Sequence, residues 1–83
     1  MKRKDQINWL LTYCIDHNLM RLDAEDLELE SAFIEATGVE LSRKQWVDRL
    51  LACAVELGMR YSMTVGVASQ DIQFTAIKLD RGE

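Results

Sequence analysis

Apolar residues near the start of the chain recur three and four positions apart, the spacing of one face of an α-helix. The pattern predicts a helix over about 5–18, with Asp5 as its N-cap, because a carboxylate accepts hydrogen bonds from unpaired backbone N–H groups. The apolar face comprises Ile7, Leu10, Leu11, Cys14 and Ile15. Trp9 lies on the flank of this face, so we expect it to be only partly covered.

The strongest local signal for the start of a helix lies at the beginning of the second half of the chain. Ser42, followed three residues later by Gln45, forms a capping box, in which each side chain bonds to the backbone N–H of the other residue. Trp46 and the leucine before the cap form a hydrophobic staple across it. A wide apolar face begins at Trp46, and Gly58 is a typical stop. We therefore predict a helix over about 43–57 with Trp46 buried.

The segment 23–37 fits two interpretations. Its alanines and glutamates favour a helix over about 24–37, capped by Asp23 and ended by Gly38. Wound as a helix, it carries two apolar stripes instead of one. The stripes consist of Leu27 and Ile34 on one side and of Leu29, Phe33 and Ala36 on the other. The alternation of leucines and glutamates over 27–30 leaves open a short strand that leads into a helix from about Ser31.

Beyond residue 59 the apolar period changes from helical to two, the period of a half-buried strand. Two β-rich runs separated by a short polar stretch predict an antiparallel hairpin over about 60–79. A two-stranded hairpin is marginal alone, so its apolar face must pack on the helices. The predicted fold class is α+β: three helices followed by a C-terminal antiparallel β-hairpin, in a single domain over residues 1–83.

Charge is distributed unevenly along this pattern. Seven of the fourteen carboxylates lie within 23–40, and that stretch contains no Lys or Arg. With a net charge of −4, the chain is unsuited to nonspecific binding of nucleic acid or anionic membrane. No run approaches the roughly 18 apolar residues of a membrane span, so we expect a cytoplasmic protein. The acidic block itself has three interpretations: a solvated face, a docking surface for a basic partner, or a mimic of the DNA backbone.

Motifs for catalysis are missing from the sequence. It has no glycine-rich phosphate loop, no G-x-S-x-G and no H-E-x-x-H. Cys14 and Cys53 are single cysteines among apolar residues, and His17 is the only histidine. We expect a non-enzyme without cofactor or metal, whose two cysteines are reduced core residues.

The acidic block and the second apolar stripe together suggest a protein-binding function. Carboxylates would form a charged rim around an apolar anchor. The candidate residues are Glu25, Glu28, Leu29, Glu30, Phe33 and Glu35. Our first hypothesis is a non-catalytic adaptor or inhibitor that binds another protein with a basic or apolar groove.

The segment Ala36-Thr37-Gly38-Val39-Glu40-Leu41-Ser42-Arg43-Lys44-Gln45-Trp46 joins a helix, a glycine turn and a capped second helix. With the hairpin that follows, the chain resembles the winged helix-turn-helix superfamily over roughly residues 5–79. In that family the second helix of the pair enters the major groove and the hairpin is the wing. The resemblance implies an alternative function as a dimeric DNA-binding regulator. Its contacts would be Arg43, Lys44, Gln45 and Arg49 on the helix and Ser69 and Gln70 at the wing tip.

The last predicted strand, 72–79, is apolar on both faces and has only Lys78 as an internal charge. Exposed strand edges of this kind invite pairing with another chain. We therefore predict a homodimer through this strand, or its burial against a partner.

Overall fold

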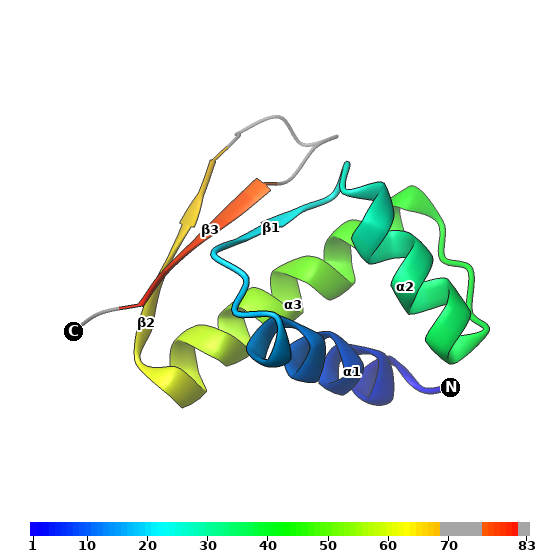
Figure 1. Ribbon diagram of the computed structural model, residues 1–83, viewed down its shortest axis with the longest axis horizontal. Coiled ribbons are helices and arrows are strands. Elements are labelled where there is room, and N and C mark those ends of the chain that lie inside the picture. Colours follow the sequence, from blue (N-terminus) through cyan, green and yellow to red (C-terminus); the bar gives the residue numbers. More distant parts are fainter. Residues whose placement is uncertain (69–75, 82–83) are drawn as a thin grey trace.

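The computed structural model describes residues 1–68 and 76–81 and has an α+β fold (Figure 1). Its elements are α1 (Arg3–Asp16), β1 (Arg21–Asp23), α2 (Leu27–Thr37), α3 (Arg43–Tyr61), β2 (Met63–Val67) and β3 (Ala76–Arg81). α3 is the central element, because it packs against α1 and against all three strands. α2 lies against α1, at the end of the molecule away from β2.

The three predicted helices are present; α3 begins at Arg43 as predicted, and the other two begin at different residues. α1 begins two residues early, and its N-cap is Lys2, not Asp5. α2 begins at Leu27, where the Asp26 carboxylate accepts from the backbone N–H groups of the next turn. Asp23 does not cap this helix, because it ends β1, and its carboxylate accepts from the Glu25 N–H at 2.8 Å. The alternative strand over 27–30 is therefore wrong.

The capping box at the start of α3 is confirmed, with both reciprocal hydrogen bonds formed. Gly58 does not end this helix, which continues to Tyr61. Its role is steric. A Cβ at Gly58 would lie 3.2 Å from the Met63 carbonyl oxygen and 3.2 Å from Val65 Cγ2. The glycine therefore lets β2 lie directly against α3.

The sheet contains a strand that the sequence did not indicate. β1 pairs with β3, and β3 pairs with β2, so the antiparallel order is β1-β3-β2. Register places Leu22 opposite Ile77 and Val65 opposite Leu79, which directs these side chains to the helices. The arrangement is thus a three-stranded sheet and not a C-terminal hairpin alone.

The central position of β3 removes the basis for the predicted homodimer. Ile77 and Leu79 were expected to seek cover from a second chain, but each is 0 % exposed within one chain. Both edges of β3 are already paired, since β1 and β2 flank it. The remainder of the predicted strand, 72–75, lies outside the described residues.

The core between α1, α2 and α3 is aromatic. Trp46 is 1 % exposed and Trp9 is half-buried, as predicted. The Phe33 ring links them, with its centroid 5.5 Å from that of Trp9 and 5.3 Å from that of Trp46. Deeper between α1 and α3 lie Cys14 and Cys53, both buried and reduced. A hydrogen bond with the Cys14 thiol, together with burial, raises the pKa of Cys53.

Candidate functional site

The acidic block forms an exposed surface on α2 and the turns beside it. We call this the acidic surface; it consists of Glu25, Asp26, Leu27, Glu28, Glu35 and Glu40, all exposed. Glu28 and Glu35 are seven residues apart, so they lie on the same side of the helix, two turns from each other. Leu27, beside them, is 74 % exposed. A large apolar side chain is thus presented to solvent beside the carboxylates of its chain neighbours Asp26 and Glu28.

Two of the predicted contact residues cannot belong to this surface. Leu29 and Phe33 are each 1 % exposed, so neither can serve as an apolar anchor for a partner. The prediction correctly separated the two stripes of α2 but assigned the wrong one to solvent. Phe33 faces inward because its ring packs between Trp9 and Trp46. The accessible stripe is that of Leu27, with Ile34 half-buried on the same side.

The carboxylates of the block have different surroundings. Glu25 forms an ion pair with Arg43, whose guanidinium also donates to the Ala24 carbonyl at 2.8 Å. Glu30 is half-buried. By contrast, the structure shows no ion pair at Glu28 or Glu35 among the residues it describes. These two groups are therefore available to an external cation.

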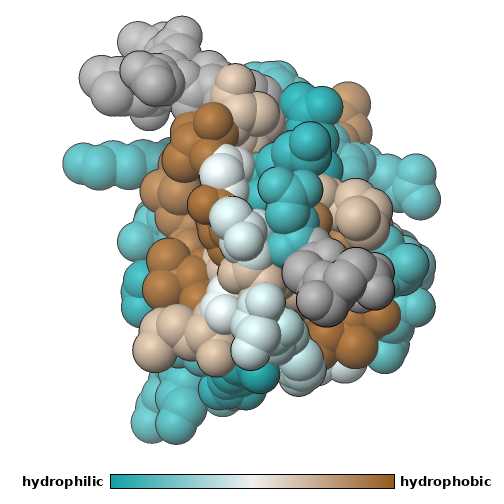
Figure 2. All heavy atoms as spheres, turned by 90° about the vertical axis from the view of Figure 1, so that its left-hand side faces the viewer, coloured by the Kyte–Doolittle hydropathy of each residue, from teal (hydrophilic) through white to brown (hydrophobic). Residues whose placement is uncertain are grey.

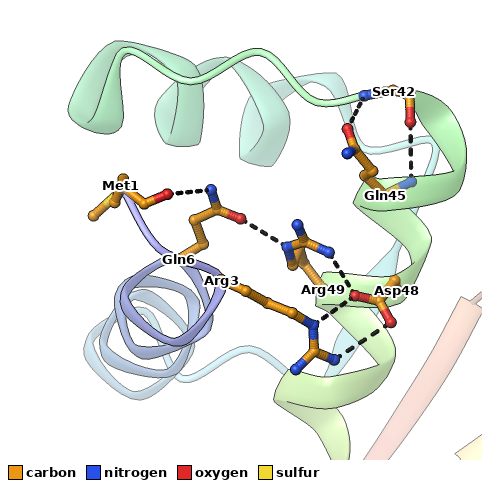
Figure 3. Close-up of polar contacts among 7 residues, drawn as sticks. All are labelled: Met1, Arg3, Gln6, Ser42, Gln45, Asp48 and Arg49. Carbon is orange, nitrogen blue, oxygen red and sulfur yellow. Dashed lines mark hydrogen bonds and ion pairs between the residues drawn. The ribbon is translucent and has the colours of Figure 1, made fainter.

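The arginines of the DNA-binding alternative are used within the fold. Arg43 ties the start of α3 to the turn before α2, as described above. Arg49 has a side chain only 13 % exposed, and its Nε donates to Gln6 Oε1 at 2.7 Å (Figure 3). Its Nη1 donates to Asp48 Oδ2 at 2.6 Å. Arg49 is therefore a structural link between α1 and α3 and not a side chain presented to a ligand.

This link continues to the start of the chain. Gln6 is 4 % exposed, and its amide nitrogen donates to the Met1 carbonyl at 3.2 Å. Asp48 accepts a second bond from Arg3 Nε at 3.0 Å (Figure 3). The hydrogen bond from Arg3, reinforced by Arg49, holds the pKa of Asp48 below its usual value. Sequence patterns gave no sign of this network, because its members are 43 and 45 residues apart.

Of the remaining DNA-binding candidates, two lie in the described part of the chain and two lie outside it. Lys44 and Gln45 are exposed at the start of α3, although the Gln45 side chain already accepts from the Ser42 N–H at 3.1 Å. Ser69 and Gln70 lie outside the described residues. The structure therefore does not assemble a basic band from these candidates within its described part.

A groove of about 450 Å³ runs between α1 and α3. Its floor is apolar and its rim carries cations, and we call it the basic groove. Its principal residues are Arg3, Lys4, Ile7, Ala52, Val55 and Arg60. Arg60 Nε donates to Glu56 Oε2 at 2.9 Å, and Glu56 is the single carboxylate among the described residues that line the groove.

Other apolar side chains are exposed at the end of the molecule that carries the sheet. Val55 and Met59 on α3 are 56 % and 76 % exposed, and Val67 on β2 is 57 % exposed. Figure 2 views this end and shows apolar surface next to polar surface. Within residues 1–68 and 76–81, no group of three metal-ligating side chains occurs. In the same residues, no helix is long and apolar enough to cross a membrane.

Comparison with models of protein families, with curated proteins and with solved structures finds no match to this chain.

Proposed function

We propose that this chain is a small non-catalytic adaptor or inhibitor of the cytoplasm that binds another protein through its acidic surface. The observation that carries the proposal is the exposure of Leu27 among carboxylates. A side chain 74 % exposed gains from desolvation at an interface, and the surrounding Glu28 and Glu35 supply electrostatic complementarity. The partner is expected to carry an apolar pocket with a basic rim.

Charge favours this function over nucleic-acid binding. Carboxylates that lie next to α3 repel phosphate, and two of the three candidate cations that would offset them are engaged internally. Of the four candidates at the start of α3, Arg43 and Arg49 bond to groups of the chain itself. A basic partner, in contrast, is attracted over a distance of roughly 10 Å at moderate salt.

The test compares capture by two variants with the same change in net charge. The first carries Glu28→Lys and Glu35→Lys, together with Leu27→Ser; the second carries Asp5→Lys and Asp16→Lys on α1. Both sets of positions are exposed, so both proteins should keep the circular dichroism of the native chain. The immobilised native chain and the immobilised second variant should capture the same specific partner. The first variant should not capture it. Equal capture by both would contradict the proposal.

The DNA-binding alternative remains as a second candidate. It is favoured by Lys44, an exposed cation at the start of a helix that follows a glycine turn, and by the paired strands β2 and β3 where the winged-helix resemblance expects a wing. A mobility shift on a sequence library at low salt, weakened by Lys44→Ala, is the expected result for this function. No shift at any sequence would remove it.

A further inference from the structure

Among the residues that the structure describes, the outer edge of β2 is paired with no other strand. β2 lies at the end of the order β1-β3-β2, so only its β3 side is occupied (Figure 1). The Ala68 N–H donates to the Ala76 carbonyl, which fixes the alternation of the ladder. In an antiparallel pair, every second residue bonds to the opposite strand, and the residues between point their N–H and C=O groups away from it. The outward groups of β2 therefore include those of Val65 and Val67.

The two outer edges of the sheet differ in how well they are protected against pairing. β1 has only three residues, and two of them, Arg21 and Asp23, are charged and form an ion pair. Short length and charge are devices by which proteins protect a strand edge. β2 has five residues, and no residue from 61 to 68 is charged. The edge of β2 is therefore the unprotected one, and the occupant that its backbone groups fit is an extended strand.

The helix beneath β2 carries an exposed apolar stripe beside this edge. β2 rests on α3 at Gly58, where a Cβ would lie 3.2 Å from Val65 Cγ2. Leu51, Val55 and Met59 follow one another every four residues on α3 and are 39 %, 56 % and 76 % exposed. At 100° per residue, all three lie within about 100° of Gly58, in one direction around the helix. We call these three residues the α3 stripe.

The α3 stripe lies on the side of Gly58 that is away from the other two strands. Leu22 of β1 and Ile77 of β3 belong to the same core as Leu50 and Leu57 of α3, so β1 and β3 lie over the buried face of this helix. The stripe is on the opposite side of Gly58 from that face. It therefore continues outward past the edge of β2, where a neighbouring helix on the same side of the sheet could reach it.

A second copy of β2 fits this edge when the two strands run antiparallel with Gly66 opposite Gly66. Val65 of each strand then lies opposite Val67 of the other, and both are hydrogen-bonded pairs, so the outward N–H and C=O groups of both valines are used. Val67, which is 57 % exposed, is covered by the half-buried Val65 of the partner subunit, because both side chains lie on the helix-facing side of the sheet. At the axis, a Cβ on Gly66 would meet nothing within 4 Å in its own chain.

We propose that this chain forms a two-fold homodimer in which the β2 strands pair antiparallel about Gly66 and join two three-stranded sheets into one. The same axis places the two α3 helices side by side on one face of the joined sheet, so each α3 stripe covers the other. An unrelated extended peptide would occupy the strand edge but leave the stripe in water. A second copy accounts for both features. The pairing uses β2, not the strand through which the sequence predicted association, and it does not involve the acidic surface on α2.

A disulfide at the two-fold axis tests the register of this pairing. Opposed residues of a non-hydrogen-bonded antiparallel pair have Cα atoms about 4.5 Å apart, a separation that a disulfide spans. Gly66→Cys should therefore give a covalent dimer in oxidised glutathione. Thr64→Cys is the matched control, because it places an equally exposed thiol on the same strand but roughly 13 Å from its copy, too far for a disulfide. The native Cys14 and Cys53 are buried, so neither competes.

Proline at position 67 tests the backbone pairing itself. The Val67 N–H points away from β3, so Val67→Pro removes a donor that the ladder of the single chain does not use, and sheet edges tolerate such a proline. Val67→Ala also shortens the side chain but keeps the N–H. Sedimentation of the native chain should give twice the mass of one 9.6 kDa chain and no larger species, because a two-fold interface is closed. The dissociation constant of Val67→Pro should exceed that of Val67→Ala about tenfold or more.

Circular dichroism and thermal melting show whether each variant is folded. If Val67→Pro is not, Val55→Lys replaces it, because Val55 is exposed in the middle of the α3 stripe and a buried unpaired charge would oppose the dimer. Its control is Leu27→Lys, which places the same charge on an exposed position of α2. Val55→Lys should be monomeric at concentrations at which Leu27→Lys is dimeric.

Three results would overturn the inference: a native chain that stays monomeric at every concentration, cross-linking of Thr64→Cys as fast as that of Gly66→Cys, or equal association of the folded variant and its control. A monomer whose β2 edge binds an extended peptide of another protein would overturn it as well. The proposed function fails separately, because the variant with Glu28→Lys and Glu35→Lys should lose capture of its partner and still form the homodimer.

Discussion

Leu27 and Leu29 lie two positions apart on α2 and have opposite surroundings. The first is 74 % exposed and the second is 1 % exposed. Helical periodicity separates them onto two stripes, and this much the sequence predicted. Which stripe faces inward depends on Trp9 and Trp46, which come from two other helices and meet at Phe33. A pattern read along one segment carries no information about that choice.

Trp46 illustrates the opposite case, in which a local pattern was sufficient. Its position after the capping box predicted burial, and the structure confirms it. Trp46→Ala should reduce the free energy of unfolding by about 3–5 kcal/mol, because a large cavity is left. Trp9→Ala should cost clearly less, since Trp9 is half-buried. Urea denaturation followed by circular dichroism compares the two.

Trp46→Phe is a matched control for that prediction. The indole Nε1 has no hydrogen-bond partner among the described residues, so Phe removes a buried unpaired donor while keeping an aromatic ring. We expect a loss well below that of Trp46→Ala. A loss as large as that of alanine would indicate that the indole N–H is bonded in solution.

The Asp48 carboxylate predicts how the stability of the folded chain depends on pH. Its pKa is lowered from 3.8 in the folded chain, chiefly by the hydrogen bond from Arg3. A lowered folded-state pKa means a contribution to stability that is complete above the ordinary pKa and is lost as the pH falls through the folded value. Asp48→Asn should therefore lower stability near pH 6, and the loss should shrink progressively as the pH falls below 3.8. Chemical denaturation over a series of pH values measures this; a loss that stays constant as the pH is lowered would contradict it.

At the scale of elements, prediction succeeded where the signals were local. The Ser42–Gln45 box fixed the start of α3, and Gly38, at φ 71°, ends α2 as its left-handed conformation requires. β1 was missed because three residues carry too little pattern, and their strand conformation depends on pairing with β3. The end of α3 was misplaced because Gly58 was interpreted from its helix-ending tendency alone.

Gly58→Ala tests the role assigned to that glycine. Alanine favours a helix interior over glycine by roughly 1 kcal/mol, so a purely local account predicts a gain in stability. We expect a loss, because the new methyl group would crowd the Met63 carbonyl and Val65 Cγ2. In a Val65→Ala background the same substitution should cost less, since one of the two crowded atoms is gone. The cycle compares the native chain, the two single variants and the double variant. If the changes in unfolding free energy of the single variants add up to that of the double variant, the contact does not matter.

At the scale of the whole molecule, the α+β class followed from composition and periodicity, whereas the position of each surface did not. The acidic block was recognisable in the sequence, but the basic groove was not. Its cations are Arg3 and Lys4 at the start of the chain and Arg60 near the end of α3, which line one groove only because α1 lies along α3. Sites formed between elements are less predictable than sites carried by one element, because no single segment contains their pattern.

The packing of α1 on α3 also predicts how the whole chain opens. Cys14 and Cys53 are each 0 % exposed between these helices, and the raised pKa of Cys53 disfavours its reactive thiolate. Iodoacetamide at pH 8 should therefore leave both thiols unmodified in the native chain, and modification should accelerate with urea in parallel with global unfolding. Mass spectrometry after timed quenching follows both residues separately. Modification of either thiol at a rate independent of urea would show that α1 leaves α3 by a local opening, in which case the core is not a single cooperative unit.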